Sequence, residues 1–175
     1  PDLPVEQLFA GNEGNVAFSI GEFDEHLYHV VPLGTFPIEL LVNEKHPLAQ
    51  KESVTIKDLQ GEPMFIESSQ FHIYHLIMEK CAESGFEPDI IFQTSGFSLC
   101  HKMVKENKGI SVVVDFVYDD MREEGMKLIP FSDGIYEWKA CMLTRRDEEE
   151  NEGVQCFRKH VQEWLQKIRS GEITR

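Results

Sequence analysis

Two clusters of polar side chains in this sequence could bind a small molecule, because each stands between a short apolar run and a helical pattern. The run at 64–66 leads into the sequence ESSQ at 67–70, and the run at 90–93 leads into TSG at 94–96. The start of a helix leaves N–H groups unpaired and carries partial positive charge, so it readily takes a carboxylate or another acceptor-rich group. In α/β sheets ligands settle at the carboxyl ends of strands, which is where both clusters are expected.

Simple helix capping explains the same hydroxyl groups, since a Ser or Thr cap is worth about 1 kcal/mol. The cap of the first helix would be Ser68 or Ser69, and that of the second Thr94 or Ser95. One hydroxyl can cap while its neighbour contacts a ligand, so both roles stay open. Phe71 would be an apolar wall of the site or part of the core. The candidate ligand contacts of this region are Ser68, Ser69, Gln70, Phe71, Thr94 and Ser95.

Metal binding and catalysis have weaker candidates. His72, His75 and Glu79 follow at i, i+3 and i+7 and could share a helical face, but no further ligand with matching spacing stands near them. Cys100 and His101 are adjacent, and adjacent helical side chains point about 100° apart, which does not suit a nucleophile and its base. No P-loop, GxSxG or GxGxxG motif occurs. We therefore expect no metal, no cofactor and no enzymatic activity.

The composition is that of a globular chain that does not contact DNA by itself. Of 175 residues, 17 are Lys or Arg and 31 are Asp or Glu, which gives a net charge of −14. Binding to a phosphate backbone relies on basic side chains, so any DNA contact would need a segment outside this chain. Acidic blocks at 119–124 and 147–152 are expected to be solvated. Four cysteines without a CxxC pair and the lack of a long apolar run predict a reduced, cytoplasmic protein with no membrane span.

Short apolar runs alternate with amphipathic helical patterns, and this alternation predicts an α/β fold with right-handed crossovers. Runs that are apolar at nearly every position suit strands covered on both faces. The strands are expected at 16–20, 38–42, 64–66, 90–93 and 110–114. Helices are expected within 68–85, 94–109 and 154–168, with a short connecting helix or turn at 54–59.

Three stretches, taken in order, resemble the effector-binding domain of LysR-type transcriptional regulators. The first is IELLVNEKHPLAQKESVTIKDL at 38–59, a strand followed by HPLA and a β-branched pair before Asp58-Leu59. The second is ESGFEPDIIFQT at 83–94, a helix end, a Gly-x-x-Pro turn and a strand. The third is LCHKMVKENKGISVVV at 99–114, a helix that runs through a Gly-Ile turn into an apolar strand. The order and spacing of the three stretches carry the resemblance.

The resemblance implies a two-lobed fold similar to type II periplasmic binding proteins, with mixed, mostly parallel sheets and flanking helices. Lobe I would comprise 1–43 and 135–175, shortened at its N-terminus, and lobe II would comprise 44–134. A small-molecule effector would bind in the cleft between the lobes, where Ser19 and Gly21 would face it from lobe I, although Gly21 is also a plausible turn glycine. The chain would form a homodimer or tetramer and act through a winged helix-turn-helix that it does not include.

The first alternative is a solute-binding protein that delivers a ligand to a transporter. Such a protein shares the implied fold and would begin with a signal peptide instead of a DNA-binding segment. The second alternative is a zinc-dependent or cysteine enzyme built on the histidine and cysteine candidates.

Overall fold

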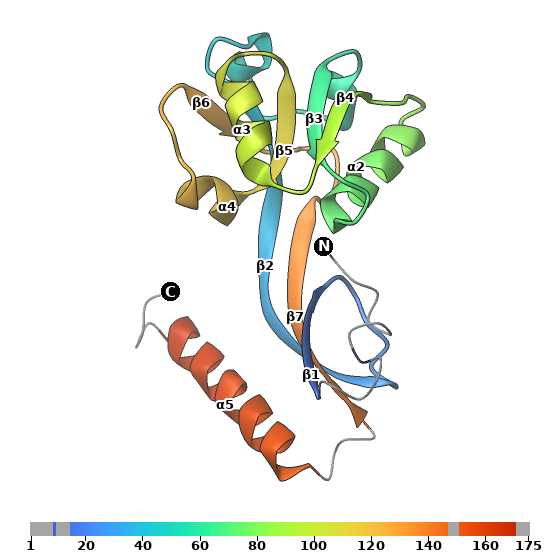
Figure 1. Cartoon of the computed structure of the whole chain (residues 1–175), viewed down its shortest axis with the longest axis vertical. Helices are drawn as coiled ribbons and strands as arrows, with labels where there is room; N and C mark the ends of the chain where they lie inside the picture. Colours follow the sequence, from blue (N-terminus) through green and yellow to red (C-terminus); the bar gives the residue numbers. More distant parts are fainter. Residues whose placement is uncertain (1–8, 10–14, 147–150, 171–175) are drawn as a thin grey trace. The chain divides into compact units, whose positions relative to one another are not determined.

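A computed structural model describes residue 9 and residues 15–146 and 151–170 of the chain, which divides into two compact units. Unit 1 is Phe36–Trp138, and unit 2 consists of the described residues within Leu3–Thr35 and Lys139–Arg175. The strands β2 (Tyr28–Asn43) and β7 (Glu137–Arg145) contribute residues to both units (Figure 1). The acidic residues at 147–150 lie outside the described residues.

Unit 1 is built on a mixed sheet in which β2 lies between β5 and β6, and β3 lies between β5 and β4. Its pairs β3–β4 and β3–β5 are parallel, whereas β2 runs antiparallel to both β5 and β6. The α/β class with a mixed sheet is therefore confirmed, and its parallel strand pairs join the three strands that helical crossovers connect. The strands are β3 (Pro63–Glu67), β4 (Asp89–Thr94), β5 (Ile110–Val114) and β6 (Met126–Ile129).

Side chains alternate between the two faces of this sheet along its strands, and helices pack on both faces. On one face, Leu40, Ile66 and Val112 pack with Ile77 of α2 (His72–Glu83) in the main core. On the other face, the cluster around Leu41 and Val113 includes residues of α3 (Phe97–Lys105) and α4 (Asp115–Asp120). The predicted turn at 54–59 contains a short 3₁₀ helix, η3 (Ile56–Leu59), and another, η2 (Pro47–Gln50), follows β2. Strands β3 and β5 are thus buried on both sides, as their apolar runs predict, whereas alternate residues of β4 are exposed, which its apolar run does not predict.

The predicted helix caps at the two polar clusters are wrong. Helix α2 begins four residues after Ser68, with Phe71 at its N-cap and no side-chain cap. Helix α3 begins after Gly96, which also provides no side-chain cap. At the first cluster, the Ser68 N–H donates to the Thr94 carbonyl at 2.8 Å. Ser68 therefore still pairs with the neighbouring strand, and the helix begins only after the turn that follows it.

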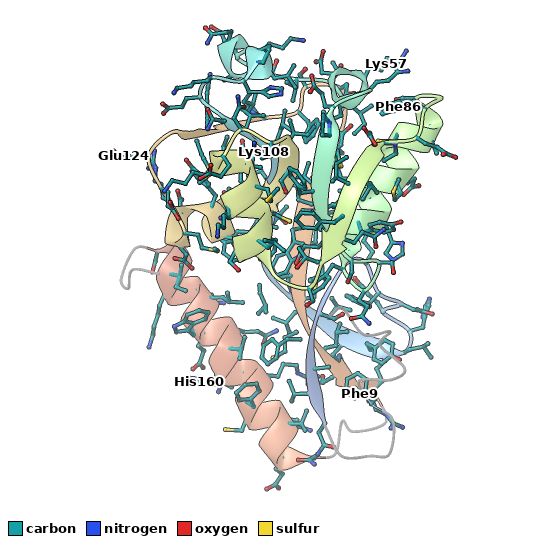
Figure 2. All side chains as sticks on the ribbon, turned by 45° about the horizontal axis from the view of Figure 1, so that its top comes forward. Phe9, Lys57, Phe86, Lys108, Glu124 and His160 are labelled. Carbon is teal, nitrogen blue, oxygen red and sulfur yellow. The ribbon has the colours of Figure 1, made fainter. Side chains whose placement is uncertain are left out.

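Unit 2 contains β1 (Val16–Ile20), which pairs antiparallel with β7, and β7 in turn neighbours β2 in the sheet order. Phe9, labelled in Figure 2, stacks on Tyr28 with ring centroids 5.6 Å apart and closes one small core. Strand β2 is 16 residues long, whereas the sequence predicts only its last part. Pro32, Gly34 and Pro37 interrupt the pattern of the first part, and such residues are depleted in strands.

Helix α5 (Glu152–Arg169) covers part of unit 2 with only some of the stripe that its sequence predicts. The Asn151 side chain caps it by accepting from the N–H groups of Gly153 and Val154 at 3.0 and 3.2 Å. Leu165 is buried against the core, but Phe157 and Trp164 of the same stripe are exposed. Within the described part of the chain, no helix is both long enough and apolar enough to cross a membrane.

Candidate functional site

Unit 1 contains a cavity of about 200 Å³ at the carboxyl ends of β3 and β5. This is the end of the sheet at which ligands bind in open α/β folds. Its walls are apolar apart from one carboxylate. The lining residues are Glu67, Phe71, Ile73, Phe97, Val114, Phe116, Val117 and Trp138.

The topology brings these residues together although they are far apart in the sequence. Glu67 is the last residue of β3, and Val114 is the last residue of β5. Phe71 stands at the start of α2, Phe97 at the start of α3, and α4 follows β5 without a gap. Each side chain is thus held by the end of a regular element, where the backbone is set by its neighbours in the sheet.

Three aromatic rings of unit 1 form a packed cluster on one side of the cavity. The centroid of the Phe116 ring lies 4.8 Å from that of Phe36 and 5.5 Å from that of Trp138, with the Phe36 and Phe116 rings edge to face. The centroids of Phe36 and Trp138 are 6.1 Å apart. Such contacts favour a defined arrangement of the rings and so stabilise this wall of the cavity.

The charged side chain in the wall of the cavity is a carboxylate. Glu67 is 4% exposed and is, among the described residues, the single charged side chain that lines the cavity. Nearby on β2, burial raises the pKa of the Glu39 carboxyl, and the Asp115 and Asp119 carboxylates raise it further. The walls of the cavity include no Lys, Arg or His within the part of the chain that the structure describes.

The structure brings the two predicted polar clusters side by side. Glu67 pairs with Thr94 in the register of β3 and β4, and the Ser68 N–H bonds to the Thr94 carbonyl. Phe71 lines the cavity, whereas the side chains of Ser69, Gln70 and Ser95 are exposed at the surface. Ser68 and Thr94 are half-buried. The clusters therefore flank one end of the sheet, and Phe71 is the member that reaches the cavity wall.

Local hydrogen bonds hold both clusters in place. The Phe71 N–H donates to the Ser68 carbonyl at 3.0 Å, and His75 Nε2 lies 2.7 Å from the Ser69 carbonyl. The Thr94 hydroxyl accepts from the Gly96 N–H at 3.2 Å. These bonds make turns of the two segments.

Ser19 and Gly21 belong to unit 2, near the end of β1. Ser19 pairs with Cys141 of β7, and the Gly21 N–H donates to the Lys139 carbonyl at 3.0 Å. Gly21 has a φ of 120°, which an L side chain rarely adopts. The turn role considered for this glycine thus has a direct structural basis, and its role in ligand binding stays a prediction.

A second hollow of about 590 Å³ lies between β2, α4 and β6 of unit 1. It is bordered by exposed charged side chains, among them Arg122 and Glu124, the latter visible in Figure 2. Glu123, on its rim, forms an ion pair with Lys105 of α3. A wide hollow edged by solvated charges offers a small ligand little apolar surface, so the cavity beside Glu67 is the stronger candidate.

The structure also describes the surroundings of the metal and nucleophile candidates of the sequence. The described residues contain no group of three His, Cys, Asp or Glu side chains placed to hold a metal. Burial raises the pKa of the Cys100 thiol to about 11, which leaves it protonated near neutral pH. Burial also lowers the pKa of the neighbouring His101.

Most of the residues that line the cavity were not among the contacts predicted from the sequence. Several lining residues are apolar and stand near the ends of strands or helices, where a sequence pattern does not distinguish them from core residues. They are Val114, Phe116, Val117 and Trp138. Glu67 did carry a signal, because an acidic residue directly after the apolar sequence PMFI is unusual at a buried strand end.

Comparison with known proteins assigns this fold to a family. The LysR substrate binding domain family model matches residues 4–166. The uncharacterized HTH-type transcriptional regulator YwbI of Bacillus subtilis (strain 168) is 25% identical over 142 residues, which cover 81% of this chain and 47% of that protein. The chain thus spans less than half the length of this curated relative.

Two solved structures show the same fold. The effector binding domain of QuiR in complex with shikimate has a TM-score of 0.76 and 16% identity, covering 93% of this chain and 77% of that one. The effector binding domain of BenM with its effector benzoate has a TM-score of 0.77 and 18% identity, covering 96% of this chain and 75% of that one. The match over residues 4–166 agrees with the order and spacing of the strands and helices. This chain therefore belongs to the LysR substrate binding domain family.

Proposed function

We propose that this chain is the sensing domain of a LysR-type transcription regulator and that its effector binds in the cavity beside Glu67. The observation that carries the proposal is a preformed, mostly apolar cavity at the carboxyl ends of β3 and β5, with a buried polar group in its wall. Sites for small molecules have this composition. The family match and the small molecules named for QuiR and BenM support the same ligand class.

The polar clusters would complete the site in unit 1. Ser68, Ser69, Gln70, Thr94 and Ser95 flank the end of the sheet at which the cavity opens, and their hydroxyl and amide groups can hydrogen-bond a ligand that extends beyond it. Ser19 and Gly21 of unit 2 stay candidate contacts. The two compact units would correspond to the two lobes that the family resemblance implies.

In the whole protein, the effector would act by shifting an equilibrium between two states of a homodimer or tetramer in the cytoplasm. The shift is limited by the difference in the effector's affinity for the two states. A net charge of −14 leaves DNA contact to another segment of the regulator. The function is binding and not catalysis, and delivery to a transporter is not favoured because the relatives are transcriptional regulators.

The test is a thermal-shift screen of metabolites against the 175-residue chain and a variant in which the cavity is filled, Val117→Phe. A ligand at 100 times its Kd stabilises the chain by about 2.7 kcal/mol, which such a screen detects. We expect hits on the unmodified chain that disappear in Val117→Phe. The matched control is Val161→Phe, which enlarges a half-buried valine on α5, away from the cavity.

Hits that stabilise the unmodified chain and Val117→Phe equally would contradict the proposed site. The double variant Ser69→Ala/Ser95→Ala examines the polar clusters separately. We expect it to weaken binding of the same hits, and an unchanged shift would remove both hydroxyls from the list of contacts.

A further inference from the structure

The charges around the cavity act on a ligand in opposite directions. The Glu67 carboxylate, which also interacts with other groups of the chain, repels an anion. The partial positive charge at the starts of α2 and α3 attracts one, and neither start has a side-chain cap. The size of the cavity and the aromatic character of its walls are therefore the features that describe what it can hold.

The aromatic rings of the lining fall into two pairs. Phe116 and Trp138 pack on each other and on Phe36. Phe71 and Phe97 line the same cavity and have no ring partner among the residues that the structure describes. A pair of aromatic rings gains more than the burial of its area alone, so a ring in the cavity would give Phe71 and Phe97 contacts that they lack within the chain.

Phe71 and Phe97 reach the cavity from opposite faces of the sheet. Phe71 stands at the start of α2 and packs against the main core. Phe97 is the first residue of α3 and packs against the cluster around Leu41. Each layer of helices thus contributes one aromatic side chain to the walls, and both side chains bound the space that a ligand can fill.

The volume of the cavity limits the body of the ligand. An engineered cavity of about 150 Å³ binds benzene, which corresponds to roughly 25 Å³ for each carbon atom. The cavity of about 200 Å³ therefore has space for about eight non-hydrogen atoms. One six-membered ring with a short arm has this size, and a ring with a further bulky substituent exceeds it.

Resting on the proposed function of this cavity, we propose that the effector carries a single planar aromatic ring, and that Phe71 and Phe97 contact this ring and limit its size. The two phenylalanines are then specificity-determining residues of the site. The polar part of the effector extends from the ring towards the hydroxyl groups that flank the cavity.

Trp138 provides a local readout of binding. The chain has two tryptophans, and the other one, Trp164, is 46% exposed on α5. In a Trp164→Phe chain the emission therefore comes from the cavity wall alone, and a ligand that displaces water from the indole shifts it to shorter wavelength. Titration of this shift gives the Kd of three probes: benzyl alcohol, cyclohexylmethanol and para-tert-butylbenzyl alcohol. All three are neutral, so the charges around the cavity act on them alike.

The first comparison examines size. We expect the Kd of para-tert-butylbenzyl alcohol to be at least about tenfold above that of benzyl alcohol, although its larger apolar surface alone favours tighter binding. The substitution Phe97→Ala enlarges the cavity, so the order of the two probes should reverse. Phe157→Ala is the matched control, because Phe157 is 42% exposed on α5 and should leave the order unchanged. The order in the Trp164→Phe chain decides the question of size even if Phe97→Ala does not fold.

The second comparison examines the ring contact. Phe97→Leu removes the ring and keeps an apolar side chain. The ratio of the Kd of cyclohexylmethanol to that of benzyl alcohol should then fall by about two- to tenfold, the effect of one aromatic pair. Phe71→Leu should act in the same way and replaces Phe97→Leu if that variant does not fold. Phe157→Leu should not change the ratio.

The outcomes separate this inference from the proposed function. Equal or tighter binding of para-tert-butylbenzyl alcohol in the Trp164→Phe chain would overturn the size limit, and an unchanged ratio in both leucine variants would overturn the ring contact. In either case, loss of binding on adding Val117→Phe still supports the cavity as the site. No response of Trp138 to benzyl alcohol also overturns the inference, and the metabolite screen then decides on the proposed function alone. Binding that Val117→Phe leaves intact overturns both.

Discussion

At the level of single residues, burial controls the chemistry of three cysteine side chains and of His101. Cys81, Cys100 and Cys141 are buried, whereas Cys156 on α5 is exposed. Burial disfavours the charged form of each group, so it raises the pKa of a thiol and lowers that of an imidazole. These residues therefore give two tests of the structure that require no ligand.

The cysteines should differ sharply in reactivity. Burial raises the pKa of the Cys81 and Cys100 thiols to about 11 and also raises that of Cys141. At about pH 8 a thiol with this pKa is ionised in about one molecule in a thousand, and the thiolate is the reactive form. We expect iodoacetamide to label Cys156 alone in the native chain and all four cysteines in urea, as read by mass spectrometry. The variant Cys156→Ser should take up no label when folded, and rapid labelling of Cys100 would contradict the structure.

His101 should make the stability of the chain depend on pH. Burial lowers its pKa below the ordinary 6.5, while Glu123 acts in the opposite direction. The unfolded chain then binds more protons than the folded chain as the pH falls through 6.5, so stability decreases on acidification and increases towards neutral pH. We expect the urea midpoint to fall between about pH 7.5 and pH 6, and to fall less in His101→Leu.

The control is His160→Leu, at an exposed position of α5 that Figure 2 labels. It should keep the pH dependence of the unmodified chain. An identical decrease in His101→Leu and in the unmodified chain would show that His101 is not the group that titrates.

At the level of secondary-structure elements, the parallel strands of unit 1 depend on a close approach between β3 and the start of β5. Gly109 precedes β5, and a Cβ atom there would collide with the Pro63 carbonyl oxygen and lie 2.9 Å from the Phe65 ring. Glycine is thus required at this position by space and not only by the turn. The cavity lies at the opposite end of the same two strands, because its lining includes their last residues.

The substitution Gly109→Ala should therefore destabilise the chain by roughly 1–3 kcal/mol, the usual cost of overpacking. The midpoint of urea unfolding measures it. At Gly134 the nearest atom to an added Cβ is 3.5 Å away, an ordinary contact, so Gly134→Ala should have much less effect. Equal effects of the two substitutions would indicate that β3 and β5 are not packed as described.

At the level of the whole molecule, charge determines what the chain cannot bind. A net charge of −14 repels DNA, and specific and non-specific binding alike rely on neutralising phosphates with basic side chains. We expect no change in the fluorescence anisotropy of a labelled duplex on addition of the chain, even at about 50 mM salt, where electrostatic binding is strong. Addition of an effector should not alter this result. Binding that weakens steeply with salt would show a basic surface that the composition does not indicate.

The sequence by itself determined the class of fold and the family. The strand predicted at 110–114 is β5 itself, and those at 64–66 and 90–93 are the centres of β3 and β4. The runs in β3 and β5 are apolar because these strands are buried on both faces, a local property that a pattern can show. The run in β4 is also mostly apolar, but alternate residues of that strand are exposed. The first half of β2 was missed because Pro32 and Gly34 disfavour a strand, and pairing with neighbouring strands overrides that preference.

Only the tertiary structure brings together the walls of the cavity in which we propose that the effector binds. The sequence pointed to hydroxyl groups at 68–69 and 94–95, and the structure placed them at the rim of the sheet end. The cavity itself joins Glu67, Phe97, Phe116 and Trp138, which are up to 71 residues apart in the chain. No spacing rule links such residues, because they meet through the parallel pairing of β3 with its neighbours and the helices that follow each strand. The carboxylate among aromatic rings is a product of that convergence.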